Sequence, residues 1–174
     1  MSARVYGPAM VWQPIPGGQD IMWSLSCALT AWRGTPYESG QSFKQLGADC
    51  IGAVFGVIDE LDGRFRARKA GMPADTSMHS RAKAIAAVRE LARRYTPCSK
   101  VEPVNGQYLV EPGDIVVTGP PGGGPGHVEL VGASKNELWH AVKGSGFHQG
   151  GWSLLDVQIL FGVYRLGDKE RWAR

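Results

Sequence analysis

The sequence predicts an α+β domain in which the helices come first and an antiparallel β-sheet follows. Apolar residues recur at helical spacing in the first 95 residues, whereas the chain beyond residue 100 contains short runs rich in β-branched and aromatic residues. Helices and strands that are segregated along a chain in this way are typical of an α+β fold. The length of 174 residues, 43% of them hydrophobic, suits a single domain with one core.

Residues 1–18 are predicted to form an extended N-terminal arm, and residues 19–174 the single domain. The arm contains three prolines and shows no apolar period. We therefore expect it to lie on the domain or on a partner, where it could carry assembly contacts.

Three helices are predicted from apolar residues that recur at i, i+3, i+4 and i+7. Gly34 ends the first helix, Gly63 lies beyond the second, and Pro97 closes the third. The third helix carries an exposed basic face, which is most often a solvated surface. The predicted spans are 20–32, 50–61 and 77–95.

Four strands are predicted beyond residue 100, where short apolar runs are separated by glycine, proline and asparagine. The predicted spans are 114–118, 128–131, 138–142 and 157–166. A short turn at 133–136 joins the second and third of these strands, so we expect the two to pair as neighbours.

Composition argues against several classes of protein. The sequence holds no run of about 18 apolar residues, so no membrane insertion is expected. Its first residues lack the apolar run of a secretory signal, and we expect synthesis in the cytoplasm without a signal peptide. The net charge of +3 is too small to indicate a nucleic-acid partner. The spacing of Cys27, Cys50 and Cys98 matches neither a disulfide framework nor a Cys-x-x-Cys zinc site.

Cys50 is the candidate nucleophile of a cysteine hydrolase. It opens the second predicted helix, where unpaired backbone N–H groups and the helix dipole favour the reactive thiolate. Asp49 precedes it, and two interpretations stay open: its carboxylate caps the helix, or it contacts the substrate. Cys27 and Cys98 are interpreted as structural or incidental.

His127 is the candidate general base. It stands at the start of the second predicted strand, directly after the glycine-rich loop at 119–126, where an imidazole can meet both a thiol and a substrate. His140, on the neighbouring strand, is the candidate for orienting the imidazole of His127. The alternatives for this third role are His148, Glu137 and Asp156.

Five short blocks carry a resemblance to a known family. They are Gly34-Thr35-Pro36-Tyr37, Gly47-Ala48-Asp49-Cys50-Ile51-Gly52, Glu111-Pro112-Gly113-Asp114-Ile115-Val116, Gly126-His127-Val128-Glu129-Leu130-Val131-Gly132 and Leu138-Trp139-His140-Ala141. In this order they resemble the motifs of the NlpC/P60 cysteine peptidases, which cut peptidoglycan stem peptides.

The resemblance implies a papain-like fold, with N-terminal helices packed on a C-terminal antiparallel β-sheet. It also implies a Cys–His–His catalytic set, in which Cys50 is the nucleophile, His127 the general base and His140 the orienting residue. The hydroxyl of Tyr37 would lie near the oxyanion, beside the backbone N–H of Cys50. Members of the family typically hydrolyse the bond between γ-D-glutamate and a diamino acid, and need no metal or cofactor.

Two positions depart from the motifs of the family. Ile51 follows the nucleophile, where many members have a serine that helps to hold the free amino group of the substrate. Glu129 replaces a small residue, and a regular strand would point its carboxylate to the same sheet face as His127. From there Glu129 could raise the pKa of the base or bind a substrate amine.

Three segments point to one branch of the family. The segments are Ala31-Trp32-Arg33-Gly34-Thr35-Pro36-Tyr37, Asp49-Cys50-Ile51-Gly52 and Gly56-Val57-Ile58-Asp59-Glu60-Leu61. They resemble the peptidases encoded with phage tails and gene transfer agents. The resemblance implies incorporation in a virion or virion-like tail that opens the cell wall during DNA entry, with tail-tip or hub proteins and the peptidoglycan stem peptide as partners.

Other interpretations stay open. The chain could be a structural tail-tip component with a vestigial catalytic set, or a wall-binding module that grips stem peptides without cutting them. A zinc site made by a cysteine with His79, His127, His140 and His148 is disfavoured, because the sequence has no H-E-x-x-H motif or closely spaced pair.

Overall fold

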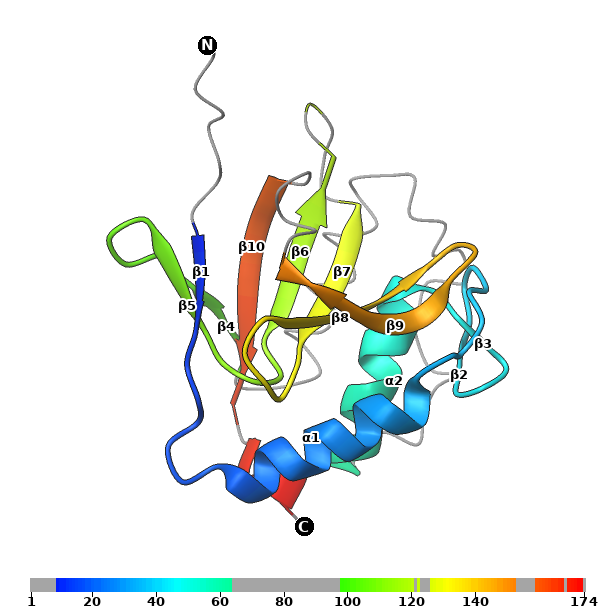
Figure 1. The fold of residues 1–174 in the computed structure, drawn as a ribbon, viewed down its shortest axis with the longest axis horizontal. Coiled ribbons are helices and arrows are strands. Elements are labelled where there is room, and N and C mark those ends of the chain that lie inside the picture. The colour runs from blue at the N-terminus through cyan, green and yellow to red at the C-terminus, as the bar shows by residue number, and fades with distance from the viewer. Residues whose placement is uncertain are drawn as a thin grey trace.

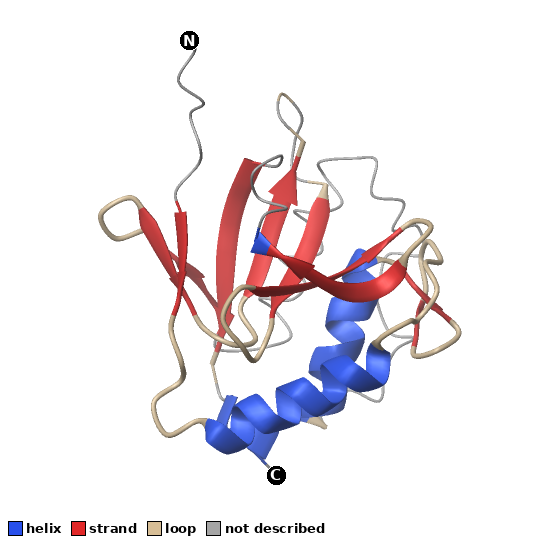
Figure 2. Ribbon diagram, in the orientation of Figure 1, coloured by secondary structure: helices blue, strands red, loops and turns tan. Residues whose placement is uncertain are grey.

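In the described part of a computed structural model of the chain, two α-helices accompany a six-stranded antiparallel sheet and two small two-stranded sheets. The structure describes residues 9–63, 98–120, 122, 126–152, 159–167 and 169–173. In the view of Figures 1 and 2, α1 and α2 lie below and to the right of the large sheet, and β1 and β5 lie to its left. The predicted α+β class is confirmed. Neither helix in the described residues is long and apolar enough to cross a membrane.

The elements follow one another along the chain with the two long helices in the first half. They are β1 (Ala9–Trp12), α1 (Gln19–Trp32), β2 (Ser42–Phe43), β3 (Gly47–Ala48), α2 (Cys50–Asp62), β4 (Cys98–Val101), β5 (Gln107–Val110), β6 (Ile115–Gly119), β7 (His127–Val131), β8 (Glu137–Val142), β9 (Gly146–Gly151), β10 (Ile159–Leu166) and the 3-10 helix η2 (Lys169–Ala173).

The large sheet has the strand order β4-β10-β6-β7-β8-β9. Strands β6 to β9 follow the chain as a meander, and β10 returns to lie between β4 and β6. The predicted pairing of the strands on either side of the turn at 133–136 is confirmed, because Leu130 pairs with Trp139 and Val131 with Leu138. This meander places the strand that carries His127 in the interior of the sheet.

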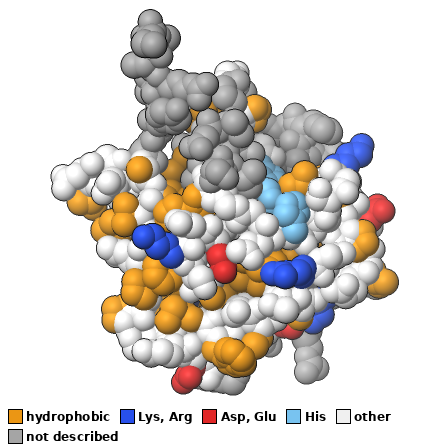
Figure 3. All heavy atoms as spheres, viewed as in Figure 1, with side chains coloured by type: hydrophobic (Ala, Val, Ile, Leu, Met, Phe, Trp, Pro, Cys, Tyr) orange, Lys and Arg blue, Asp and Glu red, His pale blue; other side chains and the backbone are white. Residues whose placement is uncertain are grey.

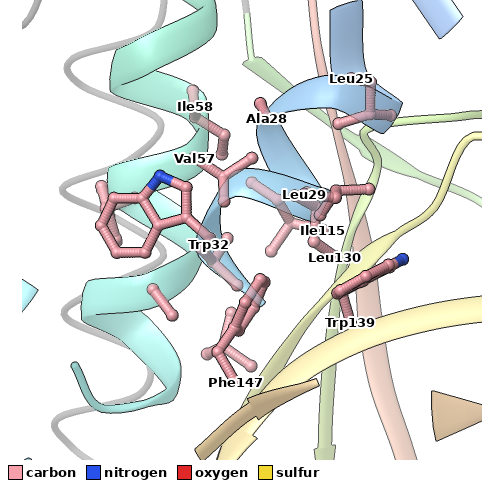
Figure 4. Packing of buried hydrophobic residues seen from close by; sticks show 14 of the residues in the cluster. Leu25, Ala28, Leu29, Trp32, Val57, Ile58, Ile115, Leu130, Trp139 and Phe147 are labelled. Atoms are coloured by element: carbon pink, nitrogen blue, oxygen red, sulfur yellow. The ribbon is translucent and has the colours of Figure 1, made fainter. Parts of the chain in front are cut away.

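The main core lies between the two helices and one face of the sheet, as Figure 4 shows. Trp32 at the end of α1 is fully buried, and its ring meets that of Phe147 edge-on at 6.5 Å between centroids. Gly56 on α2 makes room for this indole, because a Cβ at that position would collide with the Trp32 ring. Packing of this density fixes the direction of α2 and therefore the place where it begins.

A second apolar cluster lies on the other side of the sheet. It combines Met10 of β1 and Tyr108 of β5 with Val116, Leu138 and Val163 of the large sheet. Strand β1 pairs with β5 in parallel register, so this part of the N-terminal arm lies on the domain. Residues 1–8 lie outside the described residues.

The predicted elements and the observed ones differ mainly where strands are short or rich in glycine. The first two helices and the strands β6, β7, β8 and β10 were predicted within one or two residues. Strand β9 contains three glycines in six residues, and β1, β2, β3, β4 and β5 have four residues or fewer, so none carries a clear strand pattern. The predicted helix at 77–95 lies outside the described residues.

Candidate active site

The site begins at the first turn of α2, where Asp49 caps the helix. One carboxylate oxygen of Asp49 accepts a hydrogen bond from the Gly52 amide at 2.7 Å, and the other accepts from the Gly40 amide at 2.8 Å. The capping interpretation of Asp49 is therefore confirmed, whereas its contact with a substrate stays a prediction. The cap starts the helix at Cys50, whose side chain is only 2% exposed.

A loop clamps this helix start from outside. The hydroxyl of Ser42 donates to the Gly52 carbonyl at 2.6 Å, and the amide of Asp49 donates to the Gln41 carbonyl at 3.2 Å. A side chain at position 52 would collide with the Gln41 carbonyl. The glycine at position 52 therefore permits the close approach between the loop and the helix that holds Cys50 in place.

Strands β7 and β8 part beside Cys50. Their pairing in the described residues consists of Leu130 with Trp139 and Val131 with Leu138, although β7 continues to His127. The Val131 amide donates toward β6, to the Asp114 carbonyl. Since successive amides of a strand point to opposite neighbours, the Val128 amide points to the β8 side. There it acts to lower the pKa of the Cys50 thiol.

Two histidines meet directly across the parted strands. Nε2 of His127 lies 2.9 Å from Nδ1 of His140, and the two rings stand edge to face with 5.1 Å between centroids. One of these two nitrogens donates to the other. The contact engages Nε2 of His127 and leaves Nδ1 as the second nitrogen of its ring.

The other candidates for the orienting role lie elsewhere. The ring of His148 packs on that of His140 at 4.7 Å between centroids, and its Nδ1 contacts the Gly146 carbonyl at 3.0 Å. The carboxylate of Glu137 lies near the Ser134 amide, at the turn between β7 and β8. Asp156 lies outside the described residues.

Glu129 lies on the same pair of histidines and is completely buried. Its Oε1 is 3.3 Å from Nδ1 of His140 and 3.7 Å from Nε2 of His127. Both carboxylate oxygens are buried, and neither accepts a hydrogen bond from the described residues. The position of Glu129 on the face of His127 was expected from the strand period, but its contact with His140 was not.

The register of the hairpin explains this contact. Counting back from the pair Leu130 and Trp139 brings Glu129 opposite His140, and directly opposite residues share a face of the sheet. The Val128 amide as a partner of the thiol was also missed. Both depend on where β7 and β8 pair and where they part, which the sequence pattern does not encode.

Burial sets the protonation of the thiol and the imidazole. Burial raises the pKa of Cys50 to about 12, although the amides of Val128 and Ile51 act in the opposite direction. Burial also lowers the pKa of His127 to about 4, while the nearby Glu129 carboxylate acts to raise it. At pH 7 the pair is therefore a thiol and a neutral imidazole. The thiolate expected from the helix start does not form at rest, because burial outweighs the amides.

Tyr37 completes the surroundings of Cys50. Its backbone forms a bridge with Ala48, two residues before the nucleophile candidate. The pKa of the Tyr37 hydroxyl is raised by burial and, to a smaller extent, by the acidic groups of Cys50 and Asp49. In the view of Figure 3, histidine side chains reach the surface in one patch.

The fold and the site together define an α+β protein with a buried thiol at a helix start, and with a pair of histidines in contact between the strands β7 and β8. No family model matches the chain, and no curated protein matches its sequence.

Proposed function

We propose that the chain is a cysteine peptidase of the NlpC/P60 type, with the papain-like fold of that family. Its substrate is the peptidoglycan stem peptide, and its target is the bond between γ-D-glutamate and a diamino acid. One observation carries this proposal. The Val128 amide acts to lower the pKa of the Cys50 thiol, and the adjacent residue His127 contacts His140 through Nε2.

The chemistry starts from the neutral pair. As Sγ of Cys50 attacks the carbonyl carbon of the substrate, its proton passes to Nδ1 of His127, which is neutral at rest and can accept it. His140 holds the imidazole through Nε2. The negative oxygen of the tetrahedral intermediate is stabilised by the backbone N–H of Cys50 and by the Tyr37 hydroxyl.

The intermediate then collapses. The C–N bond breaks, the leaving amine takes the proton from His127, and the acyl group stays on Cys50 as a thioester. Water attacks this thioester while His127 accepts its proton, which releases the acid and restores the thiol. The buried carboxylate of Glu129 favours the imidazolium form of His127 in both steps, because it lies 3.7 Å from Nε2.

The proposal includes delivery on a phage tail or a gene transfer agent tail. It is supported by the three segments that resemble such peptidases: one ends at Tyr37, one contains Asp49 and Cys50, and one lies further along α2. In that setting the enzyme opens the cell wall during DNA entry, and its partners are tail-tip or hub proteins.

A second candidate function has one observation in its favour. Cys50 is 2% exposed and its pKa is raised to about 12, as expected for an inert thiol. The chain would then be a structural tail-tip component, or a module that binds stem peptides, with a vestigial catalytic set. We prefer the peptidase because the His127 and His140 contact has no evident structural use.

Digestion of purified diaminopimelate-type muropeptides tests the proposal. The wild-type chain should release products cut within the stem peptide, and mass spectrometry would locate the bond. Cys50→Ala should give no products, whereas Cys27→Ala, which changes an exposed cysteine of α1, should cut as the wild type does. If the folded wild-type chain leaves every muropeptide intact, the peptidase is refuted and the structural function is favoured.

A further inference from the structure

We propose that His127, Glu129 and His140 form a binding site for one zinc ion. The three candidate ligand atoms are Nε2 of His127, Oε1 of Glu129 and Nδ1 of His140. Their separations are 2.9 Å between the two nitrogens, 3.3 Å from Glu129 to His140, and 3.7 Å from Glu129 to His127. All three therefore converge on one small region between β7 and β8.

These separations suit a zinc ion in size and in angle. A triangle with these three sides accommodates an ion about 2.1 Å from every corner, which is the usual length of Zn–N and Zn–O bonds in proteins. The ion would lie less than about 1 Å from the plane of the three atoms, with ligand–metal–ligand angles of roughly 90–130° around the tetrahedral value. A fourth position stays open, as in zinc sites made by two histidines and one glutamate.

The state of the Glu129 carboxylate points to the same ligand. Its two oxygens are fully buried and accept no hydrogen bond from the described residues. A buried carboxylate without partners costs several kcal/mol, roughly, unless a cation or hydrogen-bond donors compensate. With two neutral imidazoles and one carboxylate, the three ligands carry one negative charge in total. A divalent cation bound to them would compensate this charge.

The donor set selects the class of metal. Calcium and magnesium prefer all-oxygen sites, whereas two imidazole nitrogens with one carboxylate oxygen suit zinc and neighbouring transition metals. The unequal angles favour a tetrahedral ion over an octahedral one, in which the three ligands would stand near 90° to one another. Zinc is the ion that meets both conditions.

Zinc at this site would switch off the base. This consequence rests on the proposed peptidase function, whereas the binding itself does not. A neutral imidazole that ligates zinc through Nε2 carries its hydrogen on Nδ1. His127 could then no longer accept the proton of Cys50, and the metal would also separate His127 from His140.

Zinc binding can be measured without any substrate. The full-length chain is prepared with Cys27→Ser and Cys98→Ser, so that these two thiols cannot bind the metal, and is freed of metal with a chelator. Titration with zinc against a chromophoric chelator should give one equivalent. Glu129→Gln should lower the affinity by at least about tenfold. Glu137→Gln, a glutamate of the neighbouring strand, is the matched control and should bind as before.

Two further measurements keep the result interpretable. His140→Gln should weaken zinc binding as Glu129→Gln does, and thermal unfolding of each metal-free variant shows whether it is folded. Cobalt added to the metal-free chain should give the intense visible bands of a tetrahedral ion, and these bands should vanish in Glu129→Gln. Absence of a zinc equivalent, or full affinity in folded Glu129→Gln and His140→Gln, would overturn the site.

Zinc added to a muropeptide digest separates the two proposals. Loss of cleavage that returns on chelation supports both the site and its inhibitory role. Zinc binding by a chain that never cleaves muropeptides would refute the peptidase and leave the site standing. Cleavage by a chain that binds no zinc would refute the site alone, and cleavage by the zinc-bound chain would refute the inhibitory role.

Discussion

Two buried carboxylates on neighbouring strands have opposite surroundings. Asp114, before β6, and Glu129, in β7, are both 0% exposed. Asp114 accepts hydrogen bonds from Arg165 at 2.8 Å, from the Nζ of Lys169 at 3.0 Å and from the Glu111 amide at 2.8 Å. Glu129 has only the two histidines, and accepts no hydrogen bond in the described residues.

The difference separates a structural carboxylate from a functional one. The charge of Asp114 is paired with Arg165 of β10 and with Lys169 of η2. These ion pairs connect the start of β6 to both elements. The oxygens of Glu129 accept no hydrogen bond from the described residues although they lie beside a histidine pair, and such buried groups are few in folded proteins. The comparison therefore assigns stability to Asp114 and supports the proposed chemical role of Glu129.

The largest effect on stability is expected at Asp114. Asp114→Ala leaves Glu111 as the remaining acidic partner of Arg165, at 3.0 Å, and of Lys169, at 4.0 Å, and Lys169 is itself buried. Burial already lowers the pKa of Lys169, and Asp114 is the main group that counteracts this. We expect the free energy of unfolding to fall by about 3–5 kcal/mol, measured by urea denaturation.

A matched control uses an exposed ion pair. Glu102 lies 3.7 Å from Lys100 at the surface, and Glu102→Ala should change the free energy of unfolding by less than about 0.5 kcal/mol. An equally small change in the free energy of unfolding of Asp114→Ala would contradict the structural role of Asp114.

The next effect is on the reactivity of Cys50. Because burial raises the pKa of Cys50 to about 12, the thiolate fraction is small at neutral pH and rises with pH. The rate of alkylation of Cys50 by iodoacetamide should therefore increase about tenfold per pH unit, or about a hundredfold between pH 7 and 9. Mass spectrometry of the Cys50 peptide measures it, with circular dichroism to confirm that the chain stays folded.

A flat rate over that range would show a thiolate that already exists at pH 7. Such a result would contradict the neutral resting pair of Cys50 and His127. It would also mean that the helix start and the Val128 amide outweigh burial, as the sequence alone suggested.

The sequence was sufficient for the two helices and for the strands β6, β7, β8 and β10, but not for the contacts between elements. The ends of α2 follow from Asp49 and Gly63, which the structure shows as its caps, and the period of apolar residues gives its buried face. The expected pairing of the strands around His127 and His140 followed from the short turn between them. These signals are local, so they can be recognised without knowledge of the tertiary structure.

The remaining features depend on long-range geometry. The parting of β7 and β8 frees the Val128 amide for Cys50, and no pattern in either strand marks that point. The protonation of Cys50 depends on how deeply α2 packs against the sheet. Which groups can donate a hydrogen bond to Glu129 depends on how distant segments pack around it. The sequence pattern does not encode this packing.

The smallest effect on stability is expected at Glu129. Glu129→Gln keeps the shape of the side chain and removes a charge that accepts no hydrogen bond in the described residues. In metal-free protein at pH 7, the free energy of unfolding should therefore stay within about 1 kcal/mol of the wild type or exceed it. The same substitution should reduce muropeptide cleavage, because the imidazolium of His127 loses its nearby negative charge. A loss of stability as large as that of Asp114→Ala would mean that Glu129 is a structural group whose partners lie among the residues outside the described part of the chain.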